Sequence, residues 1–320
     1  MDKPQGFPPR SYGSRLLRCC RATAIVQAIL VLHHGEPDRY ERRLSPKLID
    51  VRAPLGDVVQ MDSESIERFT TDGFIKMEQA VPPDVTAACA ELLWEQIEAM
   101  PGDRSTWTRP VYWVGNMAQA PFSAAANTAV LHDAFDALVG PGRWKPRGSL
   151  GSFPLRFPHD EEPDDAGWHI EGSYQPPGES GYWVNVHTTG RALLMLFLFT
   201  DVGEGDAPTR IRVGSHLDVP PVLAPYGERG TPMMTVGSAV AAASEHRPVT
   251  LATGRAGDVF LCHPFLVHAA QPHHGEHPRF MAQPPLDPSD DLWLGPYNLR
   301  VTDAEPPPIG ATIRTALHSA

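Results

Sequence analysis

The sequence has few of the residues that bind anionic membranes or nucleic acids, or that form disulfides in an oxidising compartment. Its 320 residues include only 4 cysteines, at spacings that suit neither a zinc site nor a disulfide framework. Their scarcity favours a reducing cytoplasm. Lys and Arg number 27 against 38 Asp and Glu, and the net charge of −11 disfavours nucleic acid and anionic membranes as partners. The His-Glu-x-x-His pattern of zinc helices is also missing.

Residues 1–60 differ in composition from the rest of the chain. They carry ten basic and six acidic side chains, net +4, which leaves −15 for residues 61–320. The apolar run 22–32 resembles an export signal, but Gln27 interrupts it and it is too short to span a bilayer. We expect residues 1–60 to be a poorly ordered or spurious extension, with Met61 as the natural first residue. A chain that begins at Met61 should then keep its stability and its metal binding.

From Met61 onward, the pattern predicts helices first and short strands afterwards. A helix is expected over 64–72, because Asp62 or Ser63 can cap its start and Gly73 can end it. The helix that starts near Pro82 has an apolar stripe formed by Val85, Ala88, Leu92 and Met100. Further helices are expected at 127–139 and 233–245.

Ten short segments have the composition of strands. The run 193–199 is apolar throughout, which predicts a central strand buried on both faces. So many short strands predict a mainly β domain with flanking helices, a jelly roll of the cupin-like double-stranded β-helix type, over 61–300. Residues 301–320 are expected to be a tail with little to bury. The predicted strands are 74–77, 150–157, 168–173, 183–186, 191–200, 211–213, 249–251, 259–261, 266–269 and 280–282.

The stretch 167–174 places an imidazole and a carboxylate two residues apart. On a strand, this spacing puts His169 and Glu171 on one face. Together with a second histidine, such a pair forms the facial triad that leaves coordination positions open on non-haem Fe(II). The alternative is an ordinary solvated strand face, since His-x-Glu also occurs by chance.

The second histidine is His268, which ends an apolar strand. Arg279 follows it by 11 residues. His263, which precedes a proline, either lines the pocket or packs in the core. The remaining candidates lie in a loop rich in Pro and Gly that is expected to be a solvated turn; they are His273, His274 and His277.

These pieces, in this order, resemble the phytanoyl-CoA dioxygenase family of Fe(II)- and 2-oxoglutarate-dependent oxygenases. The resemblance covers roughly residues 61–290. It implies a jelly-roll fold, Fe(II) held by His169, Glu171 and His268, and 2-oxoglutarate and O2 as cosubstrates. The matching segments are Phe69–Ile75, Trp168–Tyr174, Leu198–His216 and the pair His268 and Arg279.

The resemblance also implies which side chains contact the cosubstrate. Arg279 would hold its distal carboxylate, because a guanidinium offers two parallel donors. Trp183 and Asn185 are further candidate contacts, with core packing as the alternative for an aromatic on a strand. In two places the chain departs from the family: Glu171 stands where Asp is usual, and the Asn that often follows the distal His is absent.

The leading interpretation is an oxygenase that hydroxylates, or otherwise oxidises, a small molecule with release of succinate and CO2. The carboxylate of Glu171 leaves no coordination position for halide, which disfavours halogenation. The alternatives are a non-redox jelly-roll protein that binds a ligand, and a cupin-type metal-dependent isomerase or hydrolase; neither needs Arg279. Segments 106–117 and 175–183 are expected to flank the pocket mouth. The sequence fixes neither the substrate nor the oligomeric state.

Overall fold

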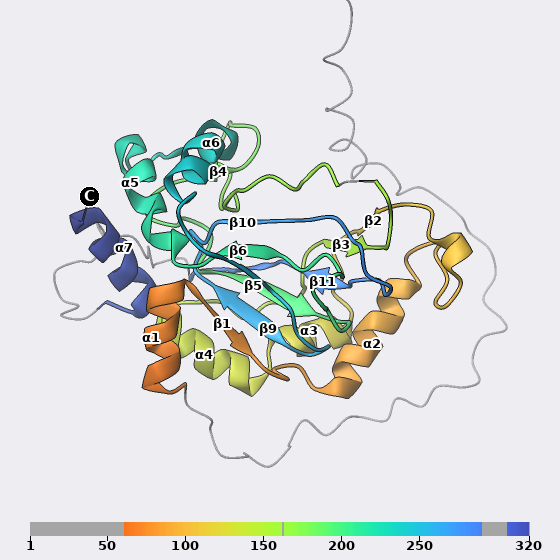
Figure 1. Cartoon of the computed structure of the whole chain (residues 1–320). Coiled ribbons are helices and arrows are strands. Elements are labelled where there is room, and N and C mark those ends of the chain that lie inside the picture. Colours follow the sequence, from red (N-terminus) through yellow and green to blue (C-terminus); the bar gives the residue numbers. More distant parts are fainter. Residues whose placement is uncertain (1–60, 162, 290–305, 320) are drawn as a thin grey trace, which may run out of the picture. The chain divides into compact units, whose positions relative to one another are not determined.

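The computed structural model describes residues 61–161, 163–289 and 306–319 (Figure 1). The predicted extension at residues 1–60 lies outside the described residues. The helices are α1 (Ser63–Asp72), α2 (Pro83–Trp94), α3 (Ala120–Ala126), α4 (Ala129–Val139), α5 (Val219–Leu223), α6 (Met233–Ala243) and α7 (Pro308–His318). The strands are β1 (Phe74–Met77), β2 (Val111–Val114), β3 (Phe153–Arg156), β4 (Trp183–Val184), β5 (Leu193–Leu198), β6 (Arg210–Arg212), β7 (Thr231–Pro232), β8 (Val249–Leu251), β9 (Val259–Cys262), β10 (His268–Ala269), β11 (Met281–Ala282) and β12 (Pro285–Leu286).

Helix α1 has the caps that the sequence predicts. The Asp62 carboxylate accepts a hydrogen bond from the Ser65 amide at 2.7 Å, which satisfies one of the free donors of the first turn. Gly73 ends the helix at φ 84°. Only glycine suits this position, because a Cβ would lie 2.4 Å from Nδ1 of His216.

Strand β5 is the centre of the largest sheet, whose order is β1-β9-β5-β11, with β12 also paired to β5. All of its residues are buried, as predicted from its apolar sequence. Its side chains alternate between two clusters. Leu193, Met195 and Phe197 belong to the cluster that the helices cover, and the three even-numbered leucines belong to a second cluster.

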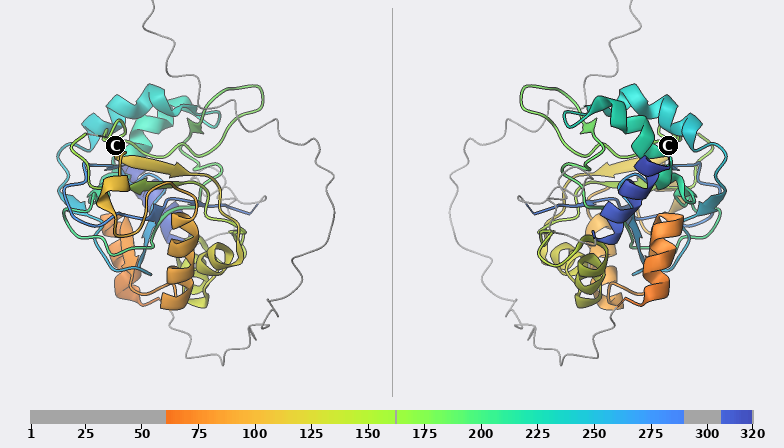
Figure 2. Two further views of the ribbon diagram at one scale, coloured as in Figure 1. Left: turned by 90° about the vertical axis from the view of Figure 1, so that its right-hand side faces the viewer. Right: turned by 90° about the vertical axis from the view of Figure 1, so that its left-hand side faces the viewer.

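The second cluster lies between the large sheet and the sheet β10-β6-β8. Ile211 of the smaller sheet and Phe260 and Met281 of the larger one all belong to it. Figure 1 shows α2, α3 and α4 on one side of the large sheet and β6 and β10 on the other, and Figure 2 shows the same layers edge-on. The described part of the chain is thus a mixed fold of helices and antiparallel sheets.

Two expectations about local structure are wrong. Helix α2 buries Thr86, Cys89 and Leu93, while Val85 and Leu92 of the predicted stripe are only half-buried against the core; the helix ends before Met100, which is exposed. The stripe was ambiguous because α2 carries apolar residues on several sides, and packing against α3 decides which side is buried. The predicted strand at 168–173 is absent as a regular element; isolated bridges take its place at His169 and at Tyr174.

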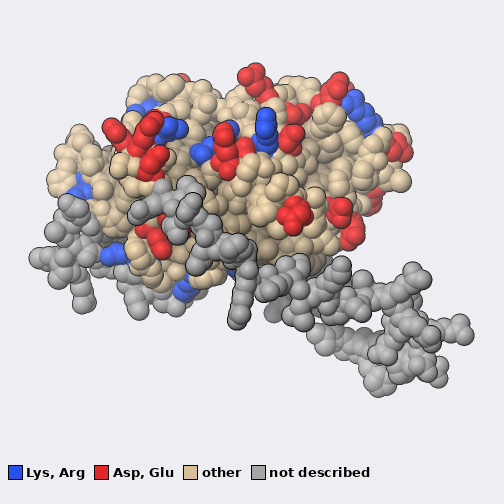
Figure 3. Space-filling model, turned by 90° about the horizontal axis from the view of Figure 1, so that it is seen from below, with Lys and Arg blue, Asp and Glu red and all other residues tan. Residues whose placement is uncertain are grey.

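The C-terminal segment is not the unpacked tail that the sequence predicts. Helix α7 buries Ile309, Ile313 and Ala316 against α1, α4 and α5. In the described part of the chain, no helix is long and apolar enough to cross a membrane. Figure 3 shows more acidic than basic side chains on the face seen from below, scattered rather than gathered in one patch.

Candidate metal centre

The backbone brings two histidines from distant parts of the sequence together. His169 and His268 form an antiparallel pair, in which each amide donates to the other's carbonyl at 3.0 Å. Side chains of directly opposed residues lie on the same face of the sheet. His268 is also opposite Ile211, which faces the space between the two sheets. Both imidazoles therefore point into the space between the sheets, and their ring centres are 4.6 Å apart.

The hydrogen bonds of both rings fix which nitrogen carries the proton. Nδ1 of His169 lies 2.7 Å from the Gly167 carbonyl oxygen, and Nδ1 of His268 lies 3.0 Å from that of Leu266. A carbonyl can only accept, so each Nδ1 is the donor and each neutral ring keeps a lone pair on Nε2. This arrangement orients an imidazole for metal coordination.

Glu171 completes the group from the same segment as His169. Its Oε1 lies 4.0 Å from Nε2 of His169 and 3.4 Å from Nε2 of His268. The ligand atoms of the three residues all lie within 4.8 Å of one another. Among the described residues, this is the one group of three or more His, Cys, Asp or Glu side chains close enough to share a metal ion.

The electrostatics of the group keep its acidic and basic members in the forms that bind a metal. Burial lowers the pKa of His169, and His268 lowers it further, which favours the neutral imidazole. Burial acts to raise the pKa of Glu171, but His268, Arg191 and His169 outweigh it and lower this pKa to about 2. Glu171 is therefore a carboxylate at neutral pH.

The contacts within the group fit a bound cation. Nε2 of His268 is buried and has no hydrogen-bond partner. It faces a carboxylate oxygen at 3.4 Å, so either a proton or a bound cation must lie between the two acceptor atoms. Two neutral imidazoles and one carboxylate are the ligand set of non-haem Fe(II), and these residues fit that ion.

A comparison with protein families identifies the family of proteins in which this centre lies. The sequence profile of the phytanoyl-CoA dioxygenase family matches residues 69–281, a range that contains all three side chains and Arg279. The chain belongs to the phytanoyl-CoA dioxygenase family. It is accordingly an Fe(II)- and 2-oxoglutarate-dependent oxygenase, with Fe(II) as its cofactor and 2-oxoglutarate as its cosubstrate. The predicted family and cofactors are confirmed.

Three solved structures of similar proteins illustrate the likeness. HygX from Streptomyces hygroscopicus, with nickel, 2-oxoglutarate and hygromycin B bound, is 16% identical, with a TM-score of 0.46 over 72% of this chain and 88% of that chain. SnoK, a carbocyclase of nogalamycin biosynthesis, is 18% identical, with a TM-score of 0.45 over 69% of this chain and 81% of that chain. AviO1 from Streptomyces viridochromogenes Tue57 is 19% identical, with a TM-score of 0.45 over 70% of this chain and 93% of that chain. A comparison with curated proteins gives no match.

Arg279, the residue that the family resemblance assigns to the cosubstrate, is buried, with 1% of it exposed. It lies two residues before Met281, so both side chains face the space between the sheets. Its Nη1 donates to the Ala207 carbonyl at 2.5 Å, and its Nε has no hydrogen-bond partner. Burial and the nearby Arg156 lower the pKa of Arg279 to about 9, so it is still a cation at neutral pH.

The other two predicted cosubstrate contacts are Trp183 and Asn185. They differ in whether their side-chain polar atoms are already hydrogen-bonded. The indole Nε1 of Trp183 is buried without a hydrogen-bond partner, which leaves one donor available. The amide nitrogen of Asn185 donates to Thr189 Oγ1 at 2.9 Å and to the Glu228 carbonyl at 2.7 Å. Its Oδ1 accepts from the amides of His187 and Thr189. The amide of Asn185 thus holds its own turn together, and contact with the cosubstrate stays a prediction.

Trp168 fixes the position of His169 from the outer face of the sheet. The guanidinium carbon of Arg212 lies 4.3 Å from the centre of the indole, and that of Arg210 lies 4.9 Å from it. Arg210 also donates to the Ala166 carbonyl at 2.7 Å. The segment before His169 is therefore held without a regular strand.

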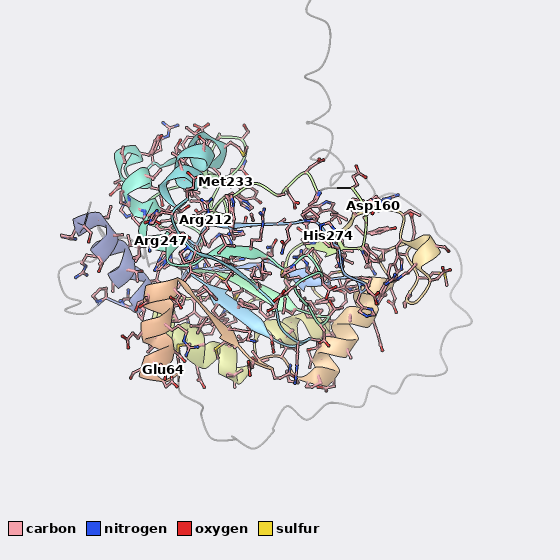
Figure 4. The ribbon with its side chains drawn as sticks, in the orientation of Figure 1. Glu64, Asp160, Arg212, Met233, Arg247 and His274 are labelled. Atoms are coloured by element: carbon pink, nitrogen blue, oxygen red, sulfur yellow. The ribbon has the colours of Figure 1, made fainter. Side chains whose placement is uncertain are left out.

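The loop with three further histidines is not a simple solvated turn. His273 is buried, and its Nε2 lies 2.8 Å from the His277 carbonyl oxygen. Burial lowers the pKa of His273 to about 4, so it is neutral at physiological pH. His274 and Asp160, which Figure 4 shows near each other, line an open hollow of about 430 Å³. The prediction of a solvated turn is wrong for His273, because the loop folds back on Gly205 through the amides of His274 and Gly275.

The two segments predicted to flank the pocket mouth contribute both exposed and buried aromatics. Trp113 is 67% exposed and Tyr182 is 66% exposed. Tyr112 is buried instead, and its ring packs against Phe157 at 4.9 Å. Trp107 packs against the same ring at 5.5 Å and donates to the Met100 carbonyl. Trp113 and Tyr182 are thus the members of these segments whose rings are open to a ligand.

Arg191 is a functional candidate that sequence reasoning missed. It precedes β5 and is buried, and the charge of Glu171 raises its pKa while burial, the larger effect, lowers it. A single arginine before an apolar strand carries no local pattern. Only the fold brings it close to the metal centre.

Proposed function

We propose that this oxygenase hydroxylates, or otherwise oxidises, a small molecule and releases succinate and CO2. His169, Glu171 and His268 would hold Fe(II), and Arg279 would bind the distal carboxylate of 2-oxoglutarate. When bound, the iron with its cosubstrates supplies the oxidising chemistry. The protein holds the ligands, orients the substrate and keeps bulk water out.

One observation carries this proposal. Nε2 of His268 and Oε1 of Glu171 face each other at 3.4 Å as two acceptors, and the hydrogen bonds of both Nδ1 atoms keep the imidazoles in that tautomer. Without a metal, the two acceptors need a proton on His268 to separate them, whereas a bound cation satisfies both of them. Bound Fe(II) relieves the repulsion.

Arg279 supports the role of a dicarboxylic cosubstrate. It is a fully buried cation with a free donor at Nε, on the face that the metal centre also uses. Neither a non-redox binding protein nor a cupin-type isomerase or hydrolase needs a fixed anchor for a second carboxylate. We also assign the free Nε1 of Trp183 to the cosubstrate as a second donor.

The reaction type follows from the third ligand. Glu171 occupies the position that a halide would need, so we propose hydroxylation, or a related oxidation, instead of halogenation. Trp113 and Tyr182, both exposed, support the two predicted mouth segments as the place where a small-molecule substrate enters.

The layered sheets support a jelly roll of the double-stranded β-helix type as the fold. The large sheet and β10-β6-β8 enclose one apolar cluster, and the metal centre and Arg279 face it. Cytoplasmic localisation is proposed from the cysteines, of which Cys89 and Cys262 are buried free thiols. Burial raises the pKa of Cys89 to about 12, which keeps this thiol unreactive.

The experiment uses protein loaded with Fe(II) under anaerobic conditions. Adding 2-oxoglutarate should produce a visible charge-transfer band, and O2 should then release succinate even without the primary substrate. Arg279→Ala should weaken 2-oxoglutarate binding by about 2 to 5 kcal/mol, because a buried carboxylate loses its partner. Arg279→Lys should recover only part of this, since an ammonium lacks the two parallel donors.

Arg247→Ala is the matched control. This arginine is also partly buried, but its Nε and Nη2 already donate to Asp218 at 2.8 and 2.7 Å. The control should bind 2-oxoglutarate like the wild type. An iron-loaded protein that shows neither the band nor 2-oxoglutarate binding would sink the proposed reaction.

A further inference from the structure

A second buried guanidinium, that of Arg191, lies beside the metal centre. Only 6% of Arg191 is exposed. Its Nη2 donates to the carbonyl of Gly172, the residue after Glu171, at 2.9 Å. Its Nε and Nη1 are buried and have no hydrogen-bond partner. The arginine is therefore held in place by one nitrogen and has two donors to offer.

Leaving such donors without a partner is costly. A buried donor without a partner costs about 1 to 3 kcal/mol, and more when the group is charged. Neither neighbouring carboxylate meets this need: Asp287 is held by Arg147 at 2.6 Å, and Glu171 makes no hydrogen bond to the two free nitrogens. Such donors are suited to bind an anionic group of a ligand.

We propose that Arg191 binds the metal-chelating carboxylate of the 2-oxo acid, at the end opposite the carboxylate that Arg279 holds. This rests on the proposed function, because it needs a 2-oxo acid bound at the metal centre. Nε and Nη1 would donate to that carboxylate, while Nη2 keeps its bond to Gly172.

The position of Arg191 relative to Glu171 selects this end of the cosubstrate. Arg191 is the arginine whose charge helps to lower the pKa of Glu171. Neighbouring ligands on one metal ion lie only about 3 Å apart, since each metal–ligand bond is about 2.1 Å long. An anion chelated next to Glu171 therefore comes within reach of the same guanidinium.

Arg279 has different electrostatic partners, so the two arginines act on different parts of the site. The charged groups that influence Arg279 are Arg156 and Asp165, whereas those that influence Arg191 are Glu171, Asp287 and Arg147. Charge balance also favours a second anion: a 2+ ion, Glu171 and Arg191 together leave two positive charges at this end.

The surroundings of Gly172 close the outer side of Arg191. A Cβ on Gly172 would lie 2.4 Å from Cβ of Tyr182 and 3.3 Å from Sδ of Met233, so both side chains pack directly on this residue. Figure 4 shows Met233 at the start of α6, above this part of the sheet. Tyr182 and Met233 thereby shield the carbonyl that holds Arg191 from bulk water.

The test measures the binding of two oxo acids to protein saturated with Ni(II), which replaces Fe(II) without redox chemistry. Pyruvate has the chelating end of 2-oxoglutarate but lacks its distal carboxylate. By calorimetry, Arg191→Gln should weaken both ligands by about 10- to 100-fold, the loss of a charged hydrogen bond. Arg279→Gln should weaken 2-oxoglutarate and leave pyruvate unchanged. Arg247→Gln should change neither.

A double substitution gives a second measurement with 2-oxoglutarate alone. The effects of Arg191→Gln and Arg279→Gln should add, because the two arginines hold different carboxylates. Effects that fail to add would place both on one carboxylate and overturn the proposal. Unchanged affinity for both oxo acids in Arg191→Gln, with only Ni(II) affinity reduced, would make Arg191 a brace for Glu171 and also overturn it.

Arg191→Lys covers the case in which the Gln variant does not fold. It keeps the charge and should show a smaller loss for both oxo acids, whereas wild-type affinity for both would again overturn the proposal. Failure of the proposed function is distinguishable, because the Ni(II)-loaded wild-type protein would then bind no 2-oxoglutarate at all.

Discussion

The protein contains two close pairs of histidines, and they differ in what their nitrogens do. The rings of His169 and His268 are 4.6 Å apart, and those of His216 and His263 are 4.9 Å apart. In the first pair, both Nδ1 atoms bond to carbonyls and both Nε2 atoms point towards Glu171. In the second pair, His263 accepts from the Phe265 amide at 3.1 Å and meets Thr312 Oγ1 at 3.1 Å.

The difference shows that proximity of histidines does not by itself make a metal site. His263 has no lone pair to spare, and His216 keeps only one, on its buried Nδ1, because its Nε2 is bound to the Thr70 carbonyl at 3.1 Å. The nearest acid, Asp218, is occupied by Arg247. The first pair offers two lone pairs and an available carboxylate, whereas the second offers one lone pair and holds α1 and α7 against the core.

The largest expected effect separates the two pairs by metal affinity. His268→Ala removes one of three ligands and should lower Fe(II) affinity by more than about 100-fold, beyond the loss expected for a residue that only supports a ligand. His263→Ala should keep its metal but lose about 2 to 4 kcal/mol of stability, because it leaves a cavity and an unpaired amide. Anaerobic Fe(II) titration and urea unfolding measure the two effects. Equal metal loss in both variants would erase the distinction.

Acid should destabilise the metal-free protein through the second pair. Burial lowers the pKa of His216 to about 4 and lowers that of His263 well below its usual value. The unfolded chain binds protons near pH 6.5 and the folded one does not, so stability is complete above that pH and falls as the pH drops towards 4. His216 alone should account for on the order of 2 kcal/mol by pH 5.

Urea unfolding at pH 7.5 and at pH 5 measures this loss. His216→Asn removes the titrating group and should show a flatter dependence of the free energy of unfolding on pH. If the variant and the wild type lose the same amount on acidification, His216 does not cause it.

A smaller effect tests how α7 is held by the second pair. Thr312→Val removes the hydroxyl that meets Nε2 of His263, and this buried nitrogen loses its side-chain partner. The free energy of unfolding should fall by about 1 to 2 kcal/mol, with Fe(II) affinity unchanged. Thr312→Ser keeps the hydroxyl and should stay close to the wild type. A loss as large in the Ser variant would point to packing of the methyl group instead.

The smallest effect tests whether the length of the Glu171 side chain, next to the first pair, matters for metal binding. Glu171→Asp keeps the ligand type but shortens the side chain by one methylene, so Fe(II) affinity should fall by about 10-fold, with turnover still measurable. Glu171→Ala should stop turnover and bind Fe(II) much more weakly. Anaerobic titration and succinate release compare the two, and wild-type behaviour of the Ala variant would remove Glu171 from the centre.

Elements with a local signal were predictable from the sequence. Asp62 and Gly73 mark both ends of α1, and the apolar run 193–199 gives β5 as a buried central strand. The three metal-centre residues were found because their spacing agrees with a family pattern. His268 was preferred over its neighbours because it ends an apolar strand, whereas the others lie in a loop rich in Pro and Gly.

Features that depend on distant partners were not predictable. Residues 168–173 have a strand-like composition but pair only at single positions, because their partner segments are short. The apolar residues of α7 gain a role only through α1, α4 and α5, which the local sequence does not reveal. The role of Arg191 is apparent only in the folded protein, where Gly172 and Glu171 lie beside it.

The backbone pair of His169 and His268 also sets when the centre can form during folding. The two residues lie about a hundred positions apart in the sequence, so closing this loop carries a large entropic cost that must be met before either ring gains a partner. Contacts of such long range form late in β-rich domains. Iron can therefore bind only a nearly native chain. Metal present during refolding should leave the rate of the first collapse unchanged. Metal bound to the native protein should instead slow its unfolding.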